Sequence, residues 1–219
     1  MHIPDGFLSP AIWVTMDAAA APAAAWCARR SRAQIDETRV PLLGVMGAFI
    51  FAAQMVNFPV APGTSGHIVG AALLAVLFGP CTAALVMAAV LLVQALLFQD
   101  GGVTALGANF WNLGMTGAFF GYLPYWLSLR AGGRLRTPAL FLGGWLAVMA
   151  GAAAVAAELS FSGVASPRLL FVSLLGVHAL TGLAEGAITV AAVRMIEKLN
   201  PKLAGLEVKS YELRGGADL

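Results

Sequence analysis

The first two residues, Met1 and His2, offer three nitrogen atoms that could hold one metal ion. A free α-amine at residue 1, the backbone nitrogen of residue 2 and an imidazole nitrogen of His2 can close adjacent chelate rings. These donors lie nearly in a plane, so the ion must displace the amide proton and accept square-planar nitrogen ligands. Ni²⁺ and Cu²⁺ meet this requirement and Co²⁺ meets it less strictly, whereas Mg²⁺ and Ca²⁺ prefer oxygen ligands.

His67 is the candidate for the fourth nitrogen. It ends the stretch PVAPGTSGH at 59–67, whose two prolines and two glycines interrupt any helix and predict a folded loop. The alternative is that His67 is only a surface residue and that a histidine at position 2 is coincidental. The chemistry also needs a mature chain that begins at Met1. We expect this because the first ten residues lack the basic and apolar regions of a cleavable signal peptide, and a bulky His2 favours retention of the methionine.

Membrane helices must position these residues, because 59% of the 219 residues are hydrophobic and only 11% are charged. Soluble domains carry about a quarter charged residues. A span takes about 20 apolar residues, so the sequence predicts an all-α integral membrane protein of about seven transmembrane helices, forming one membrane-embedded domain over 1–219. The predicted spans are 9–28, 40–58, 68–78, 81–98, 106–129, 138–157 and 169–196. The third is so short that we expect it to be tilted or preceded by a loop that dips into the membrane.

The basic residues predict the orientation of the chain. Twelve of the thirteen Lys and Arg residues fall between the first and second spans, between the fifth and sixth spans, or at and beyond the end of the last span. Only Arg168 falls on the opposite side. The positive-inside rule therefore places the N-terminus outside and the C-terminus in the cytoplasm, which requires an odd number of spans. Four segments then share the outer face, opposite a cytoplasmic tail at 197–219. They are the outer segment 1–8, the outer loop 59–67, the loop 99–104 and the loop around 158–168.

Three polar residues near the outer face are candidates for supporting the site. The amides of Asn109 and Asn112 could hydrogen-bond a metal-bound imidazole or hold the outer loops, and Ser65 could do the same beside His67. Such partners fix the tautomer and orientation of a ligating ring. Ordinary helix capping and loop bonding are the alternative for each.

Three ionisable residues, Asp17, His178 and Glu185, lie inside predicted spans. Placing an ionisable side chain in the bilayer costs free energy, so we expect these residues to have a functional role. His178 and Glu185 are seven residues apart on one helix face, which separates them by roughly 10 Å and prevents them from chelating one ion. We expect interhelical hydrogen bonds or contact with a partner subunit.

Gly44, Ala48 and Ala52 recur every four residues, the spacing that lets helix backbones approach closely in lipid. They predict packing within this chain or a docking face for another membrane subunit.

Several classes of protein are disfavoured. A net charge of +2, without a basic stripe, argues against nucleic acid as a partner. The sequence has no GxxxxGK[ST] loop and no hydrolase motif, so we expect no enzymatic activity and no organic cofactor.

Three stretches, MHIPDGFLSP at 1–10, PGTSGHIVGAAL at 62–73 and DGGVTALGANFWNLG at 100–114, resemble the CbiM/NikM family. These proteins are the substrate-binding (S) components of energy-coupling-factor transporters for cobalt and nickel. The resemblance covers essentially the whole chain and implies that Met1, His2 and His67 hold Co²⁺ or Ni²⁺ as the transported substrate. It also implies a transmembrane coupling (T) component, two cytoplasmic ATPase subunits, in some cases a small accessory membrane protein, and a bacterial or archaeal cytoplasmic membrane.

The resemblance leaves the choice between cobalt and nickel open. Some nickel versions carry the accessory component fused to the chain, and this sequence ends at Leu219 without it, which favours cobalt and a supply of cobalt for cobalamin biosynthesis. Four planar nitrogens would instead favour nickel. Two different functions also fit the sequence: a membrane assembly subunit that binds no metal, and a channel.

Overall fold

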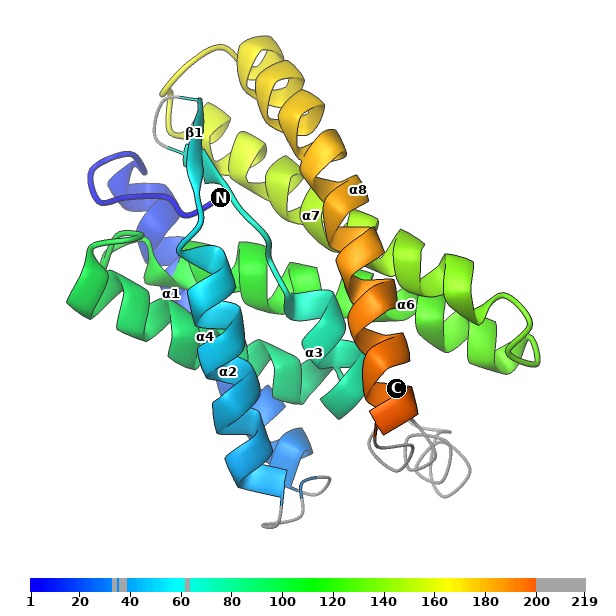
Figure 1. Ribbon diagram of the computed structural model, residues 1–219. Coiled ribbons are helices and arrows are strands. Elements are labelled where there is room, and N and C mark those ends of the chain that lie inside the picture. Colours follow the sequence, from blue (N-terminus) through cyan, green and yellow to red (C-terminus); the bar gives the residue numbers. More distant parts are fainter. Residues whose placement is uncertain (33–34, 36–38, 62–63, 200–219) are drawn as a thin grey trace.

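The computed structural model describes residues 1–32, 35, 39–61 and 64–199, and in this part of the chain long helices dominate (Figure 1). The helices are α1 (Pro10–Arg32), α2 (Val40–Gln54), α3 (Ala71–Phe78), α4 (Pro80–Val93), α5 (Leu106–Asn109), α6 (Gly117–Arg130), α7 (Arg136–Phe161) and α8 (Pro167–Leu199). Two π-helices extend them: η2 (Gln94–Phe98) continues α4, and η3 (Phe110–Thr116) joins α5 to α6. The helical architecture predicted from the sequence is confirmed.

Four helical runs in the described residues are long and apolar enough to cross a membrane: Pro10–Arg32, Pro80–Phe98, Arg136–Phe161 and Pro167–Leu199. A fifth apolar helix, Val40–Gln54, is shorter. These are the features of an integral membrane protein. Each of the seven predicted segments corresponds to a helix or to an uninterrupted helical run, and the number that crosses the bilayer stays a prediction.

The all-α prediction is wrong at the loop before His67. The second helix ends at Gln54 rather than near residue 58, and the chain forms β1 (Phe58–Ala61), which pairs antiparallel with β2 (Thr64–Gly66). Pro59 has no N–H to donate, and a two-stranded hairpin tolerates such a residue because both of its strands are edges. The predicted folded loop is thus a β-hairpin.

The third apolar segment is short, as predicted. Its helix begins only at Ala71, because Gly70 has a φ of +77°, outside the helical range. A Cβ at Gly70 would collide with Cδ1 of Ile50, so no other residue fits this turn. Residues 67–70 therefore enter the protein as irregular backbone, which membrane proteins tolerate where it is buried in protein.

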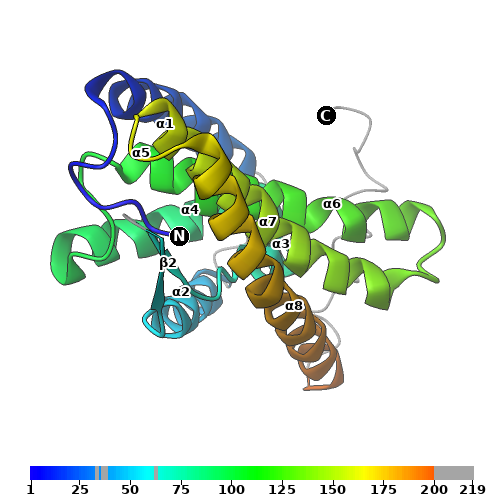
Figure 2. The same ribbon diagram turned by 90° about the horizontal axis from the view of Figure 1, so that it is seen from above.

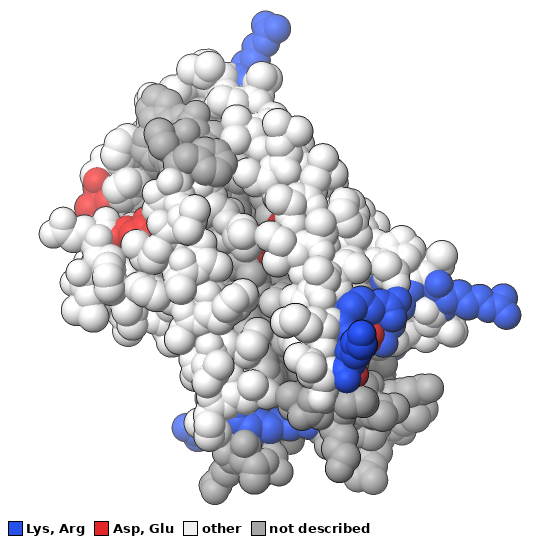
Figure 3. Space-filling view, viewed as in Figure 1, with Lys and Arg blue, Asp and Glu red and all other residues white. Residues whose placement is uncertain are grey.

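The helices alternate between two ends of the molecule. At one end, the N–H of Ser9 donates to Oγ of Ser162, in the turn between α7 and α8. At the other end, Arg136 at the start of α7 forms an ion pair with Glu197 near the end of α8. Figure 3 shows most of the visible Lys and Arg atoms at this second end, far from the hairpin and the N-terminus. Lys202, Lys209 and Arg214 lie outside the described residues.

The small-residue face on α2 does not pack within this chain. Gly44, Ala48 and Ala52 are all exposed, and a Cβ built at Gly44 meets no atom within 4 Å. Internal packing, one of the two interpretations of this spacing, is therefore wrong for the described residues.

Candidate metal centre

The N-terminal segment enters the interior of the molecule. In Figure 1 and Figure 2 the N-terminus lies close to the β1–β2 hairpin, inside the outline of the molecule. Met1 is 0% exposed and His2 is 2% exposed, although chain termini are usually at the surface. A Cβ at Gly151 of α7 would lie 3.5 Å from Cε of Met1, so the Met1 side chain occupies space that this glycine leaves open.

His2 and His67 lie against each other. Their ring centroids are 4.5 Å apart and their planes are inclined by 31°. His67 is also 2% exposed and lies directly after β2. The structure thus brings together Met1, His2 and His67, the three residues that the sequence predicted as ligands, while metal binding itself stays a prediction.

Asn109 holds the N-terminal segment in place. Its Oδ1 accepts the N–H of Ile3 at 2.8 Å, and its Nδ2 donates to the carbonyl of Ile3 at 3.0 Å. The N–H of Gly102 donates to the same carbonyl at 2.8 Å. Of the two roles considered for Asn109, the structure shows the holding of outer segments.

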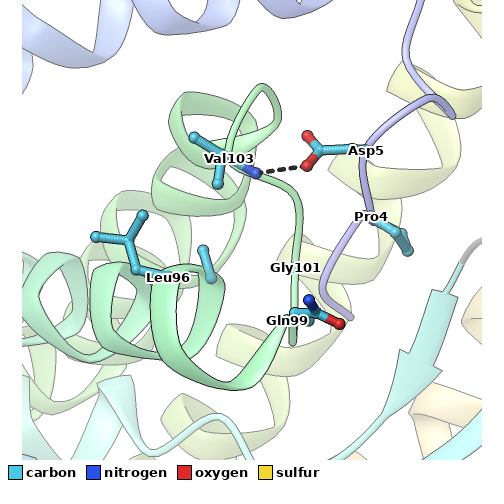
Figure 4. A pocket seen from close by; sticks show the side chains of 7 residues that line it. Pro4, Asp5, Leu96, Gln99, Gly101 and Val103 are labelled. Atoms are coloured by element: carbon cyan, nitrogen blue, oxygen red, sulfur yellow. Dashed lines mark hydrogen bonds between the residues drawn. The ribbon is translucent and has the colours of Figure 1, made fainter.

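Asp5 ties the same segment to the loop between η2 and α5. Its carboxylate accepts the N–H group of Val103 at 3.1 Å (Figure 4) and that of Thr104 at 2.8 Å. These bonds lower the pKa of Asp5, together with a bond from the Thr104 hydroxyl, which is the largest contribution. A Cβ at Gly102 would collide with the backbone nitrogen of Asp5, so the two backbones touch.

A shallow pocket lies beside this segment. Its wall is formed by residues of the N-terminal segment, of η2 and of the following loop, namely Pro4, Asp5, Ala95, Leu96, Gln99, Gly101 and Val103 (Figure 4). Gly101 also borders His2, because a Cβ at Gly101 would lie 3.4 Å from Cβ of His2. The pocket therefore reaches the molecule's surface next to the candidate centre.

The hydrogen bond of His67 determines which of its nitrogens is available. Its Nδ1 lies 2.8 Å from the carbonyl oxygen of Ile68, which can only accept, so Nδ1 carries the proton. Nε2 then has a free lone pair, and this buried atom has no hydrogen-bond partner among the described residues. Such unpaired buried atoms are rare, and a metal ligand held by a backbone carbonyl is a common arrangement.

His2 is held differently. Its Nδ1 lies 2.9 Å from Oδ1 of Asp100, and its Nε2 has no partner within the described chain. Only Nδ1 can close a six-membered chelate ring with the residue's own backbone nitrogen. Binding in the predicted mode therefore requires the ring to turn about its Cβ–Cγ bond, or Asp100 to give up its contact with Nδ1.

The donors are neutral at neutral pH. Burial lowers the pKa of the Met1 amine to about 4, although the charge of Asp100 opposes this. Burial also lowers the pKa values of His2 and His67, and the neighbouring N-terminus lowers both further. The amine and both imidazoles are consequently deprotonated and able to donate lone pairs.

The other predicted support residues lie elsewhere. The amide of Asn112 donates to Oε2 of Glu158 at 2.7 Å, rather than to either histidine. Glu158 was expected in an outer loop but is buried in α7, because that helix continues to Phe161. The side chain of Ser65 lies outside the described part of the chain.

The three ionisable residues predicted inside spans make distinct contacts. Asp17 of α1 accepts the N–H of Gly107 at 2.7 Å, and His178 bonds the carbonyl of Leu174 within its own helix. Glu185 of α8 accepts the backbone N–H groups of Val69 and Gly70, close to His67. Asp17 and Glu185 thus form the bonds between elements that were expected of them.

Three residues that support the candidate centre were missed in the sequence, namely Gln54, Gln94 and Asp100. Asp100 opens the DGGVTALGANFWNLG stretch, and its place in an outer loop was the available signal. Gln54 and Gln94 are fully buried polar residues in apolar helices, which was a second signal. No group of three His, Cys, Asp or Glu side chains in the described residues could hold a metal, so a site here needs main-chain nitrogens.

Replacing Asp100 by Asn is expected to weaken Ni²⁺ binding by roughly tenfold. The carboxylate lies beside the His2 ring and supplies a negative charge close to a divalent cation, even after its contact with Nδ1 is given up. Competition titration against a coloured chelator measures the affinity. As a control, Asp5→Asn keeps an acceptor for the 103–104 loop outside the centre and should have a smaller effect. An unchanged affinity in Asp100→Asn would exclude this role.

Long apolar helices around a buried N-terminus and two adjoining histidines define a class: a multi-pass membrane protein with a nitrogen-lined candidate metal centre. The family model described as "Cobalt uptake substrate-specific transmembrane region" (CbiM) matches residues 2–203. The chain therefore belongs to the CbiM family, whose relatives include proteins named for cobalt and for nickel transport.

Similar proteins cover most of the chain. A putative metal transport protein of Haloquadratum walsbyi is 36% identical over 97% of both chains. A cobalt transport protein CbiM of Sorangium cellulosum is 35% identical over 93% of this chain and 94% of its own length. A putative fused nickel transport protein NikMN of Archaeoglobus fulgidus is 40% identical over 92% of this chain and 67% of its own length. A crystal structure described as a transition metal transporter has a TM-score of 0.87, 33% identity, and coverage of 98% of this chain and 100% of that one.

Proposed function

We propose that this protein is the substrate-binding component of an ATP-driven, energy-coupling-factor cobalt uptake transporter. Co²⁺ is held by the Met1 amine, the amide nitrogen and imidazole of His2, and Nε2 of His67. The observation that carries the proposal is the burial of the N-terminus beside two histidine rings whose centroids are 4.5 Å apart. A buried α-amine whose pKa is about 4 is a metal ligand ready for use at neutral pH.

Capture removes water from the ion. The N-terminal segment is pinned by Asn109 and Asp5, so its backbone is held in place before the ion arrives, and the His2 ring adjusts when the ion binds. A pre-organised set of nitrogens in a dry site favours ions that accept nitrogen ligands over Mg²⁺ and Ca²⁺, which prefer oxygen. Release then requires the loops around the site to separate, and the ATPase partners supply the energy for that step.

The proposed topology has seven spans: α1, α2, α3, α4 with η2, the run α5–η3–α6, α7 and α8. The gathering of basic residues at the end away from the candidate centre supports an outer N-terminus and a cytoplasmic C-terminus. The metal centre then faces the side from which a scarce ion arrives. The membrane is the cytoplasmic membrane of a bacterium or archaeon, in which residues 1–219 form one embedded domain.

The proposed partners are a coupling (T) component, two cytoplasmic ATPases and a small accessory membrane protein. The sequence contains no phosphate-binding loop of its own, so the ATPases must be separate chains. The exposed face of Gly44, Ala48 and Ala52 is available for close helix packing in lipid. The imported cobalt serves cobalamin biosynthesis.

Nickel is the second candidate substrate, and a specific observation favours it. Three of the four proposed donors belong to a planar chelate, a geometry that suits Ni²⁺ better than Co²⁺. The description of the matching family model as cobalt uptake, and the near-complete coverage of a cobalt transport relative, favour cobalt.

Uptake of radioactive Co²⁺ tests the function. Cells that lack their own cobalt uptake should accumulate the ion when they produce this chain together with the coupling protein and ATPases of the same organism. Inactivating the ATPases by substitution of their phosphate-binding lysine should abolish accumulation. Equal uptake without this chain, or with inactive ATPases, would contradict the proposal, and parallel uptake of Ni²⁺ ranks the two substrates.

Proton release gives an independent check. The pKa values of the Met1 amine and both imidazoles lie below their usual values, so these groups are uncharged at pH 7 and have no extra proton to release. Binding should therefore release about one proton per ion, from the His2 amide. An exposed amine with a pKa of 8.0 would release a second one. Calorimetric titrations in buffers of different ionisation enthalpy count the protons. Affinity should fall about tenfold for each unit of pH because the amide proton is released, and more steeply as the pH approaches the amine pKa of about 4.

A further inference from the structure

A buried carboxylate from α8 holds the backbone that directly follows His67. Oε2 of Glu185 accepts the N–H of Val69 at 2.9 Å, and Oε1 accepts the N–H of Gly70 at 2.7 Å. Glu185 is 1% exposed and lies on a helix long enough to span a membrane. A carboxylate is expensive in this setting, and two backbone donors in irregular structure offset its cost.

The same backbone is held from the opposite side by α2. Nε2 of Gln54 donates to the carbonyl of Val69 at 2.6 Å. Oε1 of Gln54 in turn accepts from Nε2 of Gln94, in η2, at 3.0 Å. Both glutamines are 0% exposed. Residues 69–70 are thus fixed between α8 on one side and α2 with η2 on the other.

These hydrogen bonds to residues 69–70 act on His67 through one intervening residue. Ile68 lies between the clamped residues and His67, and its carbonyl oxygen accepts the Nδ1 proton of His67 at 2.8 Å. The carbonyl determines both the tautomer of the ring and its direction. A side chain at Gly70 would collide with Ile50 of α2, so the backbone at this position packs closely against that helix.

We propose that Glu185 is a positioning residue for His67, which keeps Nε2 of that ring in the plane of the other three nitrogens. This inference rests on the proposed function, since it gives Glu185 a role in binding only if His67 is a ligand. Glu185 also connects His67, the proposed fourth ligand, to α8. A displacement of α8 relative to α2 would move His67 out of the plane and lower the affinity for the ion.

The test replaces Glu185 by Gln and measures Ni²⁺ binding by the purified full chain in detergent. A glutamine keeps the shape of the side chain but presents an NH₂ group to one of the two backbone N–H groups. We expect affinity to fall by roughly 10- to 100-fold, as for other residues that orient a metal ligand. We also expect the absorption spectrum to lose the planar four-nitrogen band, and excess imidazole to restore that band by occupying the fourth position.

The matched control is Glu158→Gln, which removes another buried carboxylate of a long helix. Its amide oxygen can still accept from Asn112, and Glu158 has no bond to residues 67–70 in the described structure. This variant should bind Ni²⁺ like the parent. Thermal unfolding without metal shows whether each variant is folded. If Glu185→Gln is not folded, Gln54→Met serves instead, because it removes the hydrogen bond that holds Val69 from the α2 side. This variant should show a smaller loss of Ni²⁺ affinity, which imidazole should also restore.

The outcomes separate this inference from the proposed function. Parent-like affinity and spectrum in a folded Glu185→Gln variant would overturn the positioning role, and so would a loss that imidazole does not restore. If His67→Ala loses affinity in the same experiments, the proposed function stands without the inference. If the parent binds neither Ni²⁺ nor Co²⁺, both fail.

Discussion

Extending the chain by Gly-Ser before Met1 is expected to lower the affinity for Ni²⁺ and Co²⁺ by roughly a thousandfold, or about 4 kcal/mol. The extension converts the Met1 amine into an amide and so removes a donor with its chelate ring. The two added residues also have no room in the interior, because Met1 is 0% exposed and Ile3 is hydrogen-bonded to Asn109. Titration of the purified protein, followed by calorimetry or by visible absorption, measures the loss.

A cleavable version of the extension supplies the control. A protease site placed so that cleavage leaves Met1 as the first residue should restore the parent affinity, because the chain is then identical to the parent. Binding that is equally tight before and after cleavage would show that the α-amine is not a ligand. Weak binding in both states would point to damage during preparation, so the unextended parent is titrated beside them.

Replacing His67 by Ala is expected to have the second-largest effect. The affinity for Ni²⁺ and Co²⁺ should fall by roughly 100-fold, or about 2.7 kcal/mol. The three donors of Met1 and His2 remain, and water takes the fourth position. Because His67 is buried against His2, the substitution also leaves a space the size of an imidazole ring. The loss should appear in the same titrations and in weaker planar absorption by bound Ni²⁺.

Free imidazole distinguishes a lost ligand from a damaged fold. It should enter the space left in His67→Ala and recover most of the affinity, whereas it should do little for the parent, whose fourth position is occupied. Full affinity in His67→Ala without imidazole would remove this residue from the site. A variant that unfolds at a lower temperature and is not rescued would show that His67 has a structural role instead.

The helices and the placement of Met1, His2 and His67 could be predicted from the sequence, because the features that indicate them are local. Apolar segments separated by Arg-rich loops indicated the helices, and the few residues between His67 and the Gly79–Pro80 step indicated that the third helix is short. The chelating potential of Met1 and His2 is a property of adjacent residues and needs no fold. Placing His67 on the same face required only the alternation of spans and the positive-inside rule.

What could not be predicted depends on contacts between distant segments. Asp100 meets His2 across 98 positions, and Glu185 meets Val69 across 116. No periodicity in one segment reveals which buried carboxylate faces which backbone group. Asn112 was predicted beside the histidines because of its proximity to Asn109 in sequence, yet the two side chains point to different partners, Ile3 and Glu158. Asn112 lies inside the π-helix η3, which begins at Phe110 directly after Asn109 and changes the helical register.

The β-hairpin and the length of α7 were missed for simpler reasons. Prolines and glycines excluded a helix before His67 but did not predict pairing of two short strands. Glu158 looked like the start of a loop because a charged residue ended an apolar run, but its bond to Asn112 allows it to remain inside the helix.

The magnetic state of bound Ni²⁺ tests the central claim most directly. Square-planar Ni²⁺ with four nitrogen donors is diamagnetic, whereas six-coordinate Ni²⁺ is paramagnetic. The purified parent should bind one equivalent of Ni²⁺ in the diamagnetic form, with no paramagnetic shift of its NMR signals. Paramagnetic binding, or no binding at all, would contradict a planar site made by Met1, His2 and His67.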